Sequence, residues 1–391
     1  MLDLTRQHER VREVVLERVE AVFESQQFIL GRTVEDFESA FCAQFGSAHA
    51  VGMSSGTDAQ LAILMALGIG VGDAVVTTPY SFFATAGCIH RVGAEPLFVD
   101  IRGDTLAMDA EKLREFLTTR CRREADGGLR SPSGQRVRAI IPVHLFGACA
   151  DMDALNAVAA EFDLLVIEDA AQAIGSEYPS KVHGCQQAGT MGTASYFSFF
   201  PTKNLGAAGD AGLAVCQSEE LAAELRRVRN HGMDRQYQHR VVGGNFRLDA
   251  VQAAVLHAKL PYVAEWNAAR RQNADLYRQG FADLGERIQV PVEPWRESGL
   301  AGHHTHHQYV IRAERRDALL GHLTEAGIGH AVYYPQPLHR QECFAHLGYA
   351  EESLPEAERA SRETVALPIY PELRGDELAS VVEAVRDFYL K

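Results

Sequence analysis

The sequence of 391 residues has no close pair of cysteines and no surplus of positive charge. Its seven cysteines are widely spaced without a CxxC motif, which argues against a disulfide framework or a thiolate zinc site and predicts reduced thiols. Lys and Arg number 38 against 52 Asp and Glu, for a formal net charge of -14. This balance disfavours broad binding to nucleic acids or anionic membranes, because both need basic side chains.

Long apolar runs are also missing. The longest, from residue 61 to about 72, is shorter than the ~20 residues that a membrane-spanning helix needs. The first residues, MLDLTRQHERVREVV, are charged throughout and lack the apolar core of a signal peptide. We therefore predict a cytoplasmic protein. Its length permits one large domain and a smaller one, because single hydrophobic cores stop growing at roughly 250–300 residues.

Short β-rich runs alternate with helical segments from residue 48 to about 215. The expected strands read HAVGM, DAVVTTP, EPLFVDI, RAIIPVHLF and DLLVIEDAA, and segments such as MDALNAVAAEF lie between them. Because the strands are almost entirely apolar, they predict an α/β domain with a mostly parallel sheet between helices. Cofactor and substrate residues in such domains lie in the loops at the carboxyl ends of the strands.

A different pattern begins after residue 247. A long helical stretch runs from 248 to about 281, and QYVIR then begins a region of isolated strands and helices. We predict a large domain over residues 1–247, with an N-terminal arm over about 1–27, and a smaller C-terminal α+β domain over 248–391. The polar segment CRREADGGLRSPSGQRVR, which starts at Cys121, predicts a surface loop.

Three segments carry residues suited to chemistry. The first is Ser54-Ser55-Gly56-Thr57-Asp58, which follows a predicted strand and opens a helix. Free N–H groups and the positive end of the helix dipole suit a phosphate at this position. Ser, Thr and Asp are also common N-caps, and for this segment alone plain capping is the more common meaning.

The second and third segments are IEDAAQAIG and SYFSFFPTKNLGAAGDAG. Asp169 follows Glu168 at the end of an apolar strand, where a carboxylate can keep a heteroaromatic nitrogen protonated, although a helix-capping acid fits equally well. Lys203 lies in an aromatic and glycine-rich stretch with Ser198 five residues earlier. Burial there would favour a neutral amine that can form a Schiff base, whereas a surface lysine is the alternative.

Together the three segments match the needs of pyridoxal phosphate: a phosphate turn, a partner for the pyridine nitrogen, a hydroxyl and a Schiff-base lysine. At this point the sequence resembles the DegT/DnrJ/EryC1/StrS family of pyridoxal-phosphate enzymes, the sugar aminotransferases of fold type I. The matching segments extend over nearly the whole chain: FILGRTVEDFESAF, SSGTDA, IEDAAQAIG, SFFPTKNLGAAGDAG, NFRLDAVQAAVL, HQYVIR, YYPQPLH and VALPIYP.

The resemblance implies a role for individual residues. Lys203 would link to the cofactor and act as acid and base, Asp169 would pair with the pyridine nitrogen, and Gln172 would contact the ring oxygen. Phe82 would stack on the ring, with a core phenylalanine as the alternative. The residues that would bind the phosphate are Gly56, Thr57, Ser198 and Asn245. Asn245, in GGNFRLD, would come from a neighbouring subunit, so the resemblance also implies a homodimer with shared active sites.

The resemblance further implies L-glutamate as amino donor and a keto nucleotide sugar as acceptor. PTKNLGAAGDAG is closer to the branch that aminates C3-keto sugars, typically PTKNLGAxGDGG, than to the C4 branch, although Ala211 replaces a glycine. UDP-linked and dTDP-linked sugars are not separable from these residues. Tyr334 and His339, in YYPQPLH, match a segment that approaches the sugar, and His144 is a weaker candidate.

Alternatives of other classes remain open. Family members that are dehydratases carry histidine in place of the lysine, so Lys203 argues against that subclass. A non-enzymatic regulator that binds DNA is disfavoured by the net charge and by the absence of a recognisable helix-turn-helix.

Two groups of charged or metal-binding residue types complete the sequence reading. His303, His304, His306 and His307 form a histidine cluster, but no carboxylate or thiolate is close by in sequence, so we predict no metal site there. Arg226, Arg227 and Arg229 are interpreted as a solvated helix face rather than as a pyrophosphate site.

Overall fold

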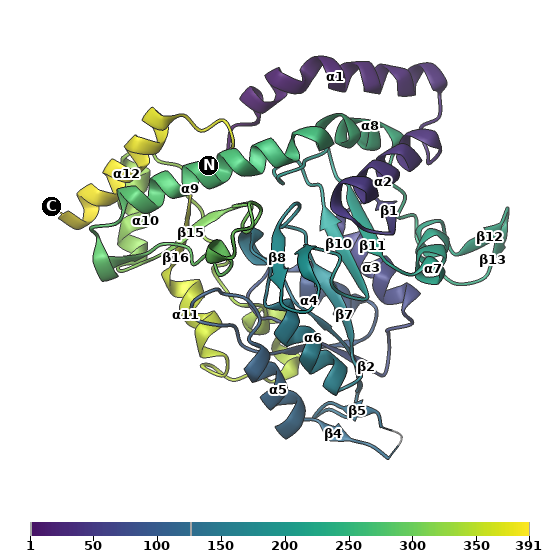
Figure 1. Ribbon diagram of the computed structural model, residues 1–391. Coiled ribbons are helices and arrows are strands. Elements are labelled where there is room, and N and C mark those ends of the chain that lie inside the picture. Colours follow the sequence, from purple (N-terminus) through teal and green to yellow (C-terminus); the bar gives the residue numbers. More distant parts are fainter. Residues whose placement is uncertain (1, 126, 391) are drawn as a thin grey trace.

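The computed structural model describes residues 2–125 and 127–390 and is built around a central sheet (Figure 1). The main path of this sheet has the order β1 (His49–Met53), β11 (Gly212–Cys216), β10 (Ala194–Ser198), β7 (Leu165–Asp169), β6 (Arg136–Ile141), β2 (Asp73–Thr77) and β3 (Glu95–Phe98). From β10 to β3 all neighbours are parallel, whereas β11 is antiparallel to both β1 and β10. The predicted strands are therefore confirmed.

Helices cover both faces of the sheet because consecutive strand residues point to opposite sides. In β2, Val75 packs in the core formed with α3 (Gly56–Ala66), α4 (Ala84–Arg91) and α7 (Glu219–Arg229). Its neighbours Ala74 and Val76 pack on the opposite face with α5 (Ala110–Thr119) and α6 (Met152–Glu161). Helices α2 (Arg32–Phe45) and α8 (Ala250–Lys259) cover that same face beside β1, β10 and β11.

The sequence predicted a surface loop from Cys121 onward, but part of this segment forms strands. β4 (Arg122–Arg123) and β5 (Leu129–Arg130) form a short antiparallel hairpin, and β5 also pairs with the first residue of β6. Extending an existing strand satisfies backbone groups that a loop would leave to water. Two further hairpins are β8 (Glu177–Ser180) with β9 (Gly184–Gln187), and β12 (Met233–Arg235) with β13 (Gln238–His239), which projects from the body in Figure 1.

The predicted helical stretch after residue 247 is confirmed with one interruption. α8 is followed by a 3₁₀ turn, Leu260–Tyr262, that contains Pro261, and then by α9 (Val263–Gly280). The N-terminal helix α1 (Leu4–Ser25) packs Val11 and Val15 against Val255 and Trp266 of these helices. Helix α8 packs against the large sheet, so by its contacts it belongs with the large domain. The division of the chain into two domains after residue 247 stays a prediction.

A smaller antiparallel sheet forms the C-terminal part, with the order β14 (Ile288–Gln289), β15 (Tyr309–Ala313) and β16 (Thr364–Leu367). Its core is shared with α9, α10 (Arg316–Glu325) and α12 (Gly375–Leu390), while α11 (Pro355–Glu363) leads into β16. The remaining short 3₁₀ helices are Leu145–Gly147, Gly285–Arg287, Arg296–Ser298, Leu338–Arg340 and Glu342–Leu347. Within residues 2–125 and 127–390, no helix has both the length and the apolar character to cross a membrane.

Candidate active site

The three chemistry-bearing segments meet at one edge of the central sheet, where β1, β7 and β10 end. Asp169 is the last residue of β7, Ser198 is the last residue of β10, and Lys203 follows in the loop after β10. The charge of Asp169 acts on the amine of Lys203, so the two groups lie close to each other. Parallel strands bring their carboxyl ends together in this way, as the sequence had predicted.

The turn between β1 and α3 forms a tight backbone cradle. Ser55 is the N-cap of α3, because its hydroxyl accepts a hydrogen bond of 3.0 Å from the N–H of Asp58. A Cβ atom on Gly56 would come within 2.8 Å of the Cβ of Ser198, and one on Gly212 within 2.2 Å of the Ser55 carbonyl. Ser55 therefore caps α3, and Gly56 and Ser198 also approach each other closely beside the start of that helix.

Asp169 is almost completely buried and is held by two donors. The hydroxyl of Thr85 donates to Oδ2 over 2.8 Å, and the N–H of Ala171 donates to Oδ1 over 3.1 Å. The hydroxyl of Ser81 lies 2.8 Å from that of Thr85. A carboxylate oriented by such bonds retains lone pairs for the N–H of a protonated heterocycle. Phe82 lies in the same segment as Ser81 and Thr85, and the residue is 59% exposed. It is therefore not a core phenylalanine, which was the alternative interpretation.

Lys203 is the titratable group best suited to nucleophilic chemistry. Burial lowers the pKa of its ammonium group to about 8, and the negative charge of Asp169 opposes that shift only in part. An amine with this pKa is neutral in roughly a tenth of molecules at pH 7, far more than an ordinary lysine, and nucleophilic attack requires this neutral form. The adjacent Asn204 bonds to Asn267, to the Thr305 carbonyl and to the His307 ring, and so anchors this loop to the chain beyond residue 248.

Glu168 faces the opposite side of β7 from Asp169 and serves the fold. Its carboxylate accepts the N–H groups of Gly189, Met191 and Gly192 at 2.7–2.8 Å. His144 lies 2.8 Å away, and since its Nδ1 accepts the N–H of Ala150, its Nε2 carries the proton that is donated to Glu168. The weak candidate His144 therefore has a structural partner.

Gln172 and Tyr334, predicted from distant segments, are brought together. The amide of Gln172 donates to the hydroxyl of Tyr334 over 3.0 Å, and its carbonyl accepts the N–H of Phe146 over 2.7 Å. Tyr80, which the sequence reading had not singled out, supports this pair: its hydroxyl donates to the Tyr333 carbonyl over 2.5 Å and accepts the N–H of Tyr334 over 3.2 Å. Its place just before SFF, the segment that carries Phe82, was the available signal.

His339 and Asn245 lie in different surroundings. The His339 ring is buried, and its Nε2 lies 3.1 Å from Glu358, so the ring has a partner within the fold. A contact between His339 and the substrate stays a prediction, and this buried environment does not favour it. Asn245 immediately precedes Phe246, whose carbonyl accepts the N–H of Ser54 over 2.9 Å. The segment of Asn245 thus passes beside the cradle of its own chain, and its reach to a neighbouring subunit stays a prediction.

The arginine cluster in the last turn of α7 is paired with acids of this chain, and Arg229 is buried rather than on a solvated face as the sequence predicted. Arg226 pairs with Glu219, Arg227 with Glu224 and Asp234, and the buried Arg229 with Glu38. These ion pairs favour a structural role over a pyrophosphate site.

The histidine cluster has a carboxylate that the sequence reading missed. Glu293 lies 2.7 Å from His303, and the rings of His304 and His306 stack at 3.8 Å. In the described parts of the chain, no group of three or more His, Cys, Asp or Glu side chains is arranged to hold a metal ion.

Comparison with known proteins gives a consistent result. A family model described as the DegT/DnrJ/EryC1/StrS aminotransferase family matches residues 9–386. A protein of Geobacillus stearothermophilus named a pleiotropic regulatory protein is 42% identical, with 100% of this chain and 98% of that protein covered. UDP-N-acetyl-3-dehydro-alpha-D-glucosamine 3-aminotransferase of Acidithiobacillus ferrooxidans is 39% identical, with 99% and 96% covered.

Two more relatives add to this. dTDP-3-amino-3,4,6-trideoxy-alpha-D-glucose transaminase of Micromonospora megalomicea is 39% identical, with 97% of this chain and 96% of that protein covered. Among solved structures, DesV from S. venezuelae, crystallised with a ketimine intermediate, is 36% identical with a TM-score of 0.89, and 100% and 98% of the chains are covered.

Proposed function

The chain belongs to the DegT/DnrJ/EryC1/StrS aminotransferase family, and from this membership we propose that it moves an amino group from L-glutamate to the C3 keto group of a nucleotide-linked hexose. The coarser statement holds without the proposal: it is a pyridoxal-phosphate-dependent sugar aminotransferase with the fold of that family. The observation that carries the aminotransferase chemistry is Lys203 beside Asp169 at the end of the sheet.

The residues at this edge of the sheet fit pyridoxal phosphate. Gly56, Thr57 and Ser198 would hold its phosphate, because the start of α3 offers backbone N–H groups and Gly56 leaves no Cβ in the cradle. Asp169 would hold the proton on the ring nitrogen, Gln172 would contact the ring oxygen, and the exposed ring of Phe82 would cover one face. When bound, the cofactor supplies an electron sink for the carbon that loses its proton.

Lys203 would serve twice in this reaction. Its Nζ, neutral in roughly a tenth of molecules at pH 7 because of its lowered pKa, would bond to the aldehyde carbon of the cofactor with loss of water. Once released by the amino donor, the same Nζ would accept the proton from the α-carbon of L-glutamate and return it as an acid. Asp169, held by Thr85 and Ala171, keeps its charge directed at the ring nitrogen throughout.

The preference for C3 rests on two supports. The stretch PTKNLGAAGDAG is closer to the C3 branch, and two of the relatives named above are 3-amino-sugar enzymes. The departure at Ala211 is sterically mild, because its side chain lies in the buried core while Gly212, the second residue of the pair, meets the Ser55 backbone. A C4-keto acceptor is the alternative, and the nucleotide is UDP or dTDP.

We also propose a homodimer in which Asn245 reaches the cofactor phosphate of the partner. The support is the position of Asn245 at the base of the projecting β12–β13 hairpin, together with the family membership. Exposed apolar side chains on and beside that hairpin, Tyr237 and Val242, fit a surface that another chain covers.

The Lys203 assignment predicts a visible signature. Protein incubated with pyridoxal phosphate should absorb above about 400 nm, and Lys203→Ala should lose this band together with glutamate-dependent transamination. Lys259→Met is the matched control, because burial also lowers the pKa of Lys259, yet its amine donates to the Gly206 carbonyl. A wild-type protein without the band would contradict the function, and would leave the regulatory role named for one relative as the better explanation.

A half-reaction tests the acceptor. The amino form of the enzyme, prepared with L-glutamate, is mixed with 3-keto and 4-keto nucleotide sugars carrying UDP or dTDP, and the return of the band above about 400 nm is followed. We expect faster return with 3-keto sugars. Faster return with 4-keto sugars would overturn the C3 preference while leaving the aminotransferase function intact.

A further inference from the structure

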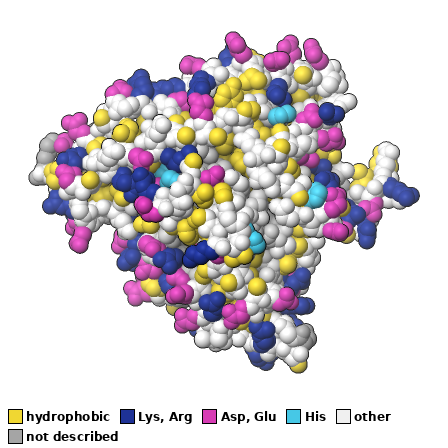
Figure 2. Space-filling view, viewed as in Figure 1, with side chains coloured by type: hydrophobic (Ala, Val, Ile, Leu, Met, Phe, Trp, Pro, Cys, Tyr) yellow, Lys and Arg dark blue, Asp and Glu magenta, His cyan; other side chains and the backbone are white. Residues whose placement is uncertain are grey.

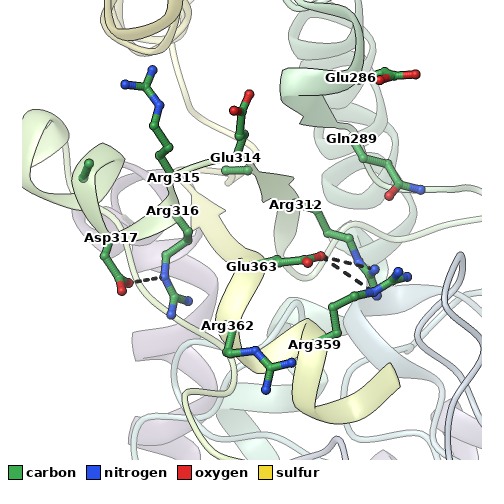
Figure 3. Close-up of a pocket in the computed structure, with 12 residues that line it drawn as sticks. Glu286, Gln289, Arg312, Glu314, Arg315, Arg316, Asp317, Arg359, Arg362 and Glu363 are labelled. Atoms are coloured by element: carbon green, nitrogen blue, oxygen red, sulfur yellow. Dashed lines mark hydrogen bonds and ion pairs between the residues drawn. The ribbon is translucent and has the colours of Figure 1, made fainter. Parts of the chain in front are cut away.

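A second polar cleft lies in the C-terminal part, away from Lys203. It has a volume of about 630 Å³ and opens between the end of β15, the start of α10 and α11 (Figure 3). Five arginines contribute to its walls: Arg312, Arg315, Arg316, Arg359 and Arg362. Among the residues that the structure describes, none that lines the cleft is aromatic, and alanine is the largest apolar residue of the lining.

Arg312 is the central feature of this cleft. The residue is only 9% exposed, and its Nη2 is buried without a hydrogen-bond partner. Its Nη1 lies 3.5 Å from the carboxylate of Glu363, which is at the limit of a hydrogen bond. Burial and the charge of Arg359 both lower the pKa of Arg312. A buried guanidinium N–H without an acceptor is costly, and a small rotation of Arg312 toward an anion in the cleft would give it one.

Two arginines of α11 line the cleft together with Arg312, and they differ in how they are paired. Arg359 Nε lies 3.9 Å from Glu363, so this single carboxylate faces two guanidinium groups, as the dashed lines in Figure 3 show. Arg359 also pairs with Glu356 over 2.8 Å. Arg362 is exposed on the same helix, and no ion pair or hydrogen bond is found for it in the described chain.

The other two arginines are engaged elsewhere. Arg315 points away from Glu363 in Figure 3, and its guanidinium lies 4.6 Å from the centre of the Phe388 ring. Arg316 donates to the Thr364 carbonyl over 2.8 Å and pairs with Asp317. Arg312, Arg359 and Arg362 therefore form the anion-facing group of the cleft.

We propose that this cleft binds a small phosphorylated metabolite that also carries hydroxyl groups. Planar guanidinium forks match phosphate oxygens, so Arg312, Arg359 and Arg362 would hold the phosphate. The lining also includes Glu286, Gln289 and Glu314, which accept hydrogen bonds from hydroxyls. The absence of aromatic side chains disfavours a nucleobase, which is commonly stacked on aromatic rings, so a sugar phosphate fits the lining better than a nucleotide does.

The cleft is separate from the pocket of Lys203. Strand β16 and the fully buried Tyr80 lie between them, since the Tyr80 hydroxyl contacts Thr364 Oγ1 at 2.8 Å on one side and the Tyr333 carbonyl at 2.5 Å on the other. Tyr334, the next residue, bonds to Gln172. The nucleotide sugar and the phosphorylated metabolite would therefore occupy different sites of the same chain.

Calorimetric titration of the cofactor-loaded enzyme tests the proposal, because the cofactor phosphate then fills the cradle at Gly56. The probes are glucose 6-phosphate, inorganic phosphate and glucose. We expect glucose 6-phosphate to bind more tightly than phosphate, and glucose not to bind. Arg359→Gln with Arg362→Gln should weaken glucose 6-phosphate at least about tenfold, as the loss of charge-assisted hydrogen bonds implies.

Arg315→Gln is the control, since it removes one positive charge from the same cleft but from a guanidinium that points away, and each single variant, Arg359→Gln and Arg362→Gln, is compared with it. It should change the affinity less than about twofold. Both variants alter exposed or half-exposed side chains, so we expect both to fold. An unchanged cofactor band checks this. No binding to the wild type, or equal binding to the double variant, would overturn the proposal. Equal affinity for phosphate and glucose 6-phosphate would overturn the hydroxyl-bearing part.

Discussion

Lys203 owes its chemistry to a balance between two opposing effects. Burial disfavours the ammonium form, and the nearby charge of Asp169 favours it, with a resulting pKa of about 8. Either effect alone would make a poorer catalyst. A lysine that is fully paired with a carboxylate stays protonated, and a buried lysine far from Asp169 would not lie beside the carboxylate proposed to bind the ring nitrogen.

This balance predicts a pH-dependent stability of the cofactor-free protein. The unfolded chain keeps an ordinary lysine pKa near 10.5, so between pH 8 and about 10.5 it binds one proton more than the folded chain does. The free energy of unfolding should therefore rise with pH across this window, by at most about 3 kcal/mol. Urea unfolding of the wild type and of Lys203→Met at several pH values measures the difference. Parallel curves for the two proteins would refute the lowered pKa.

At the scale of elements, the cradle depends on backbone surfaces in contact. Strand β11 begins at Gly212, directly against the Ser55 carbonyl, and β10 ends at Ser198 against Gly56. The loop from β10 to β11 carries Lys203, so the strand pair, the lysine and the start of α3 are fixed relative to one another. A side chain at either glycine would separate them.

Gly212→Ala should therefore disturb both the fold and the cofactor site. Its Cβ would lie 2.2 Å from the Ser55 backbone, which forces a shift costing about 1–3 kcal/mol of stability. Cofactor affinity should fall with it, as measured by titration of the band above about 400 nm. Gly209→Ala, three residues earlier, is the control, because its Cβ would approach only the Gln252 side chain at 3.1 Å. Equal effects of the two changes would contradict the steric argument.

The elements differ in how far the sequence predicts them. Strands such as 73–77 and 165–169 were predicted because each carries an apolar run, and the end of the second located Asp169. The hairpin at 122–130 was not predicted, because two-residue strands rich in arginine carry no apolar pattern. Contacts between distant segments, such as Gln172 with Tyr334, depend on packing that no local pattern encodes.

At the scale of the whole molecule, the net charge of -14 is mixed rather than segregated. Acidic and basic side chains alternate over the face seen in Figure 2. The arginines near 226 are paired with acids, and the arginine cleft of β15 and α11 was not predicted from the sequence. That cleft joins residues from separate elements, about 50 positions apart, so spacing along the chain gave no signal for it.

Shared active sites predict complementation between inactive subunits. Lys203→Ala and Asn245→Ala should each have little activity, since one lacks the lysine and the other the proposed phosphate contact. After unfolding and refolding of an equal mixture, about half of the dimers are mixed and each has one intact site, so about a quarter of wild-type activity should return. If the refolded mixture has no more activity than the two variants have separately, each active site is made of residues from a single subunit. Light scattering should give twice 43.0 kDa for the wild type.

The two adjacent carboxylates of β7 help to specify the pairing register of this strand. Glu168 collects three backbone amides and a histidine on one face, and Asp169 presents its oxygens to the pocket on the other. A slip of one residue would exchange their faces, so an acid would still reach the pocket but the amides at 189–192 would lose their acceptor. The register of β7 is therefore specified by the bonds of Glu168 on one face, and this register in turn places Asp169 in the pocket on the other.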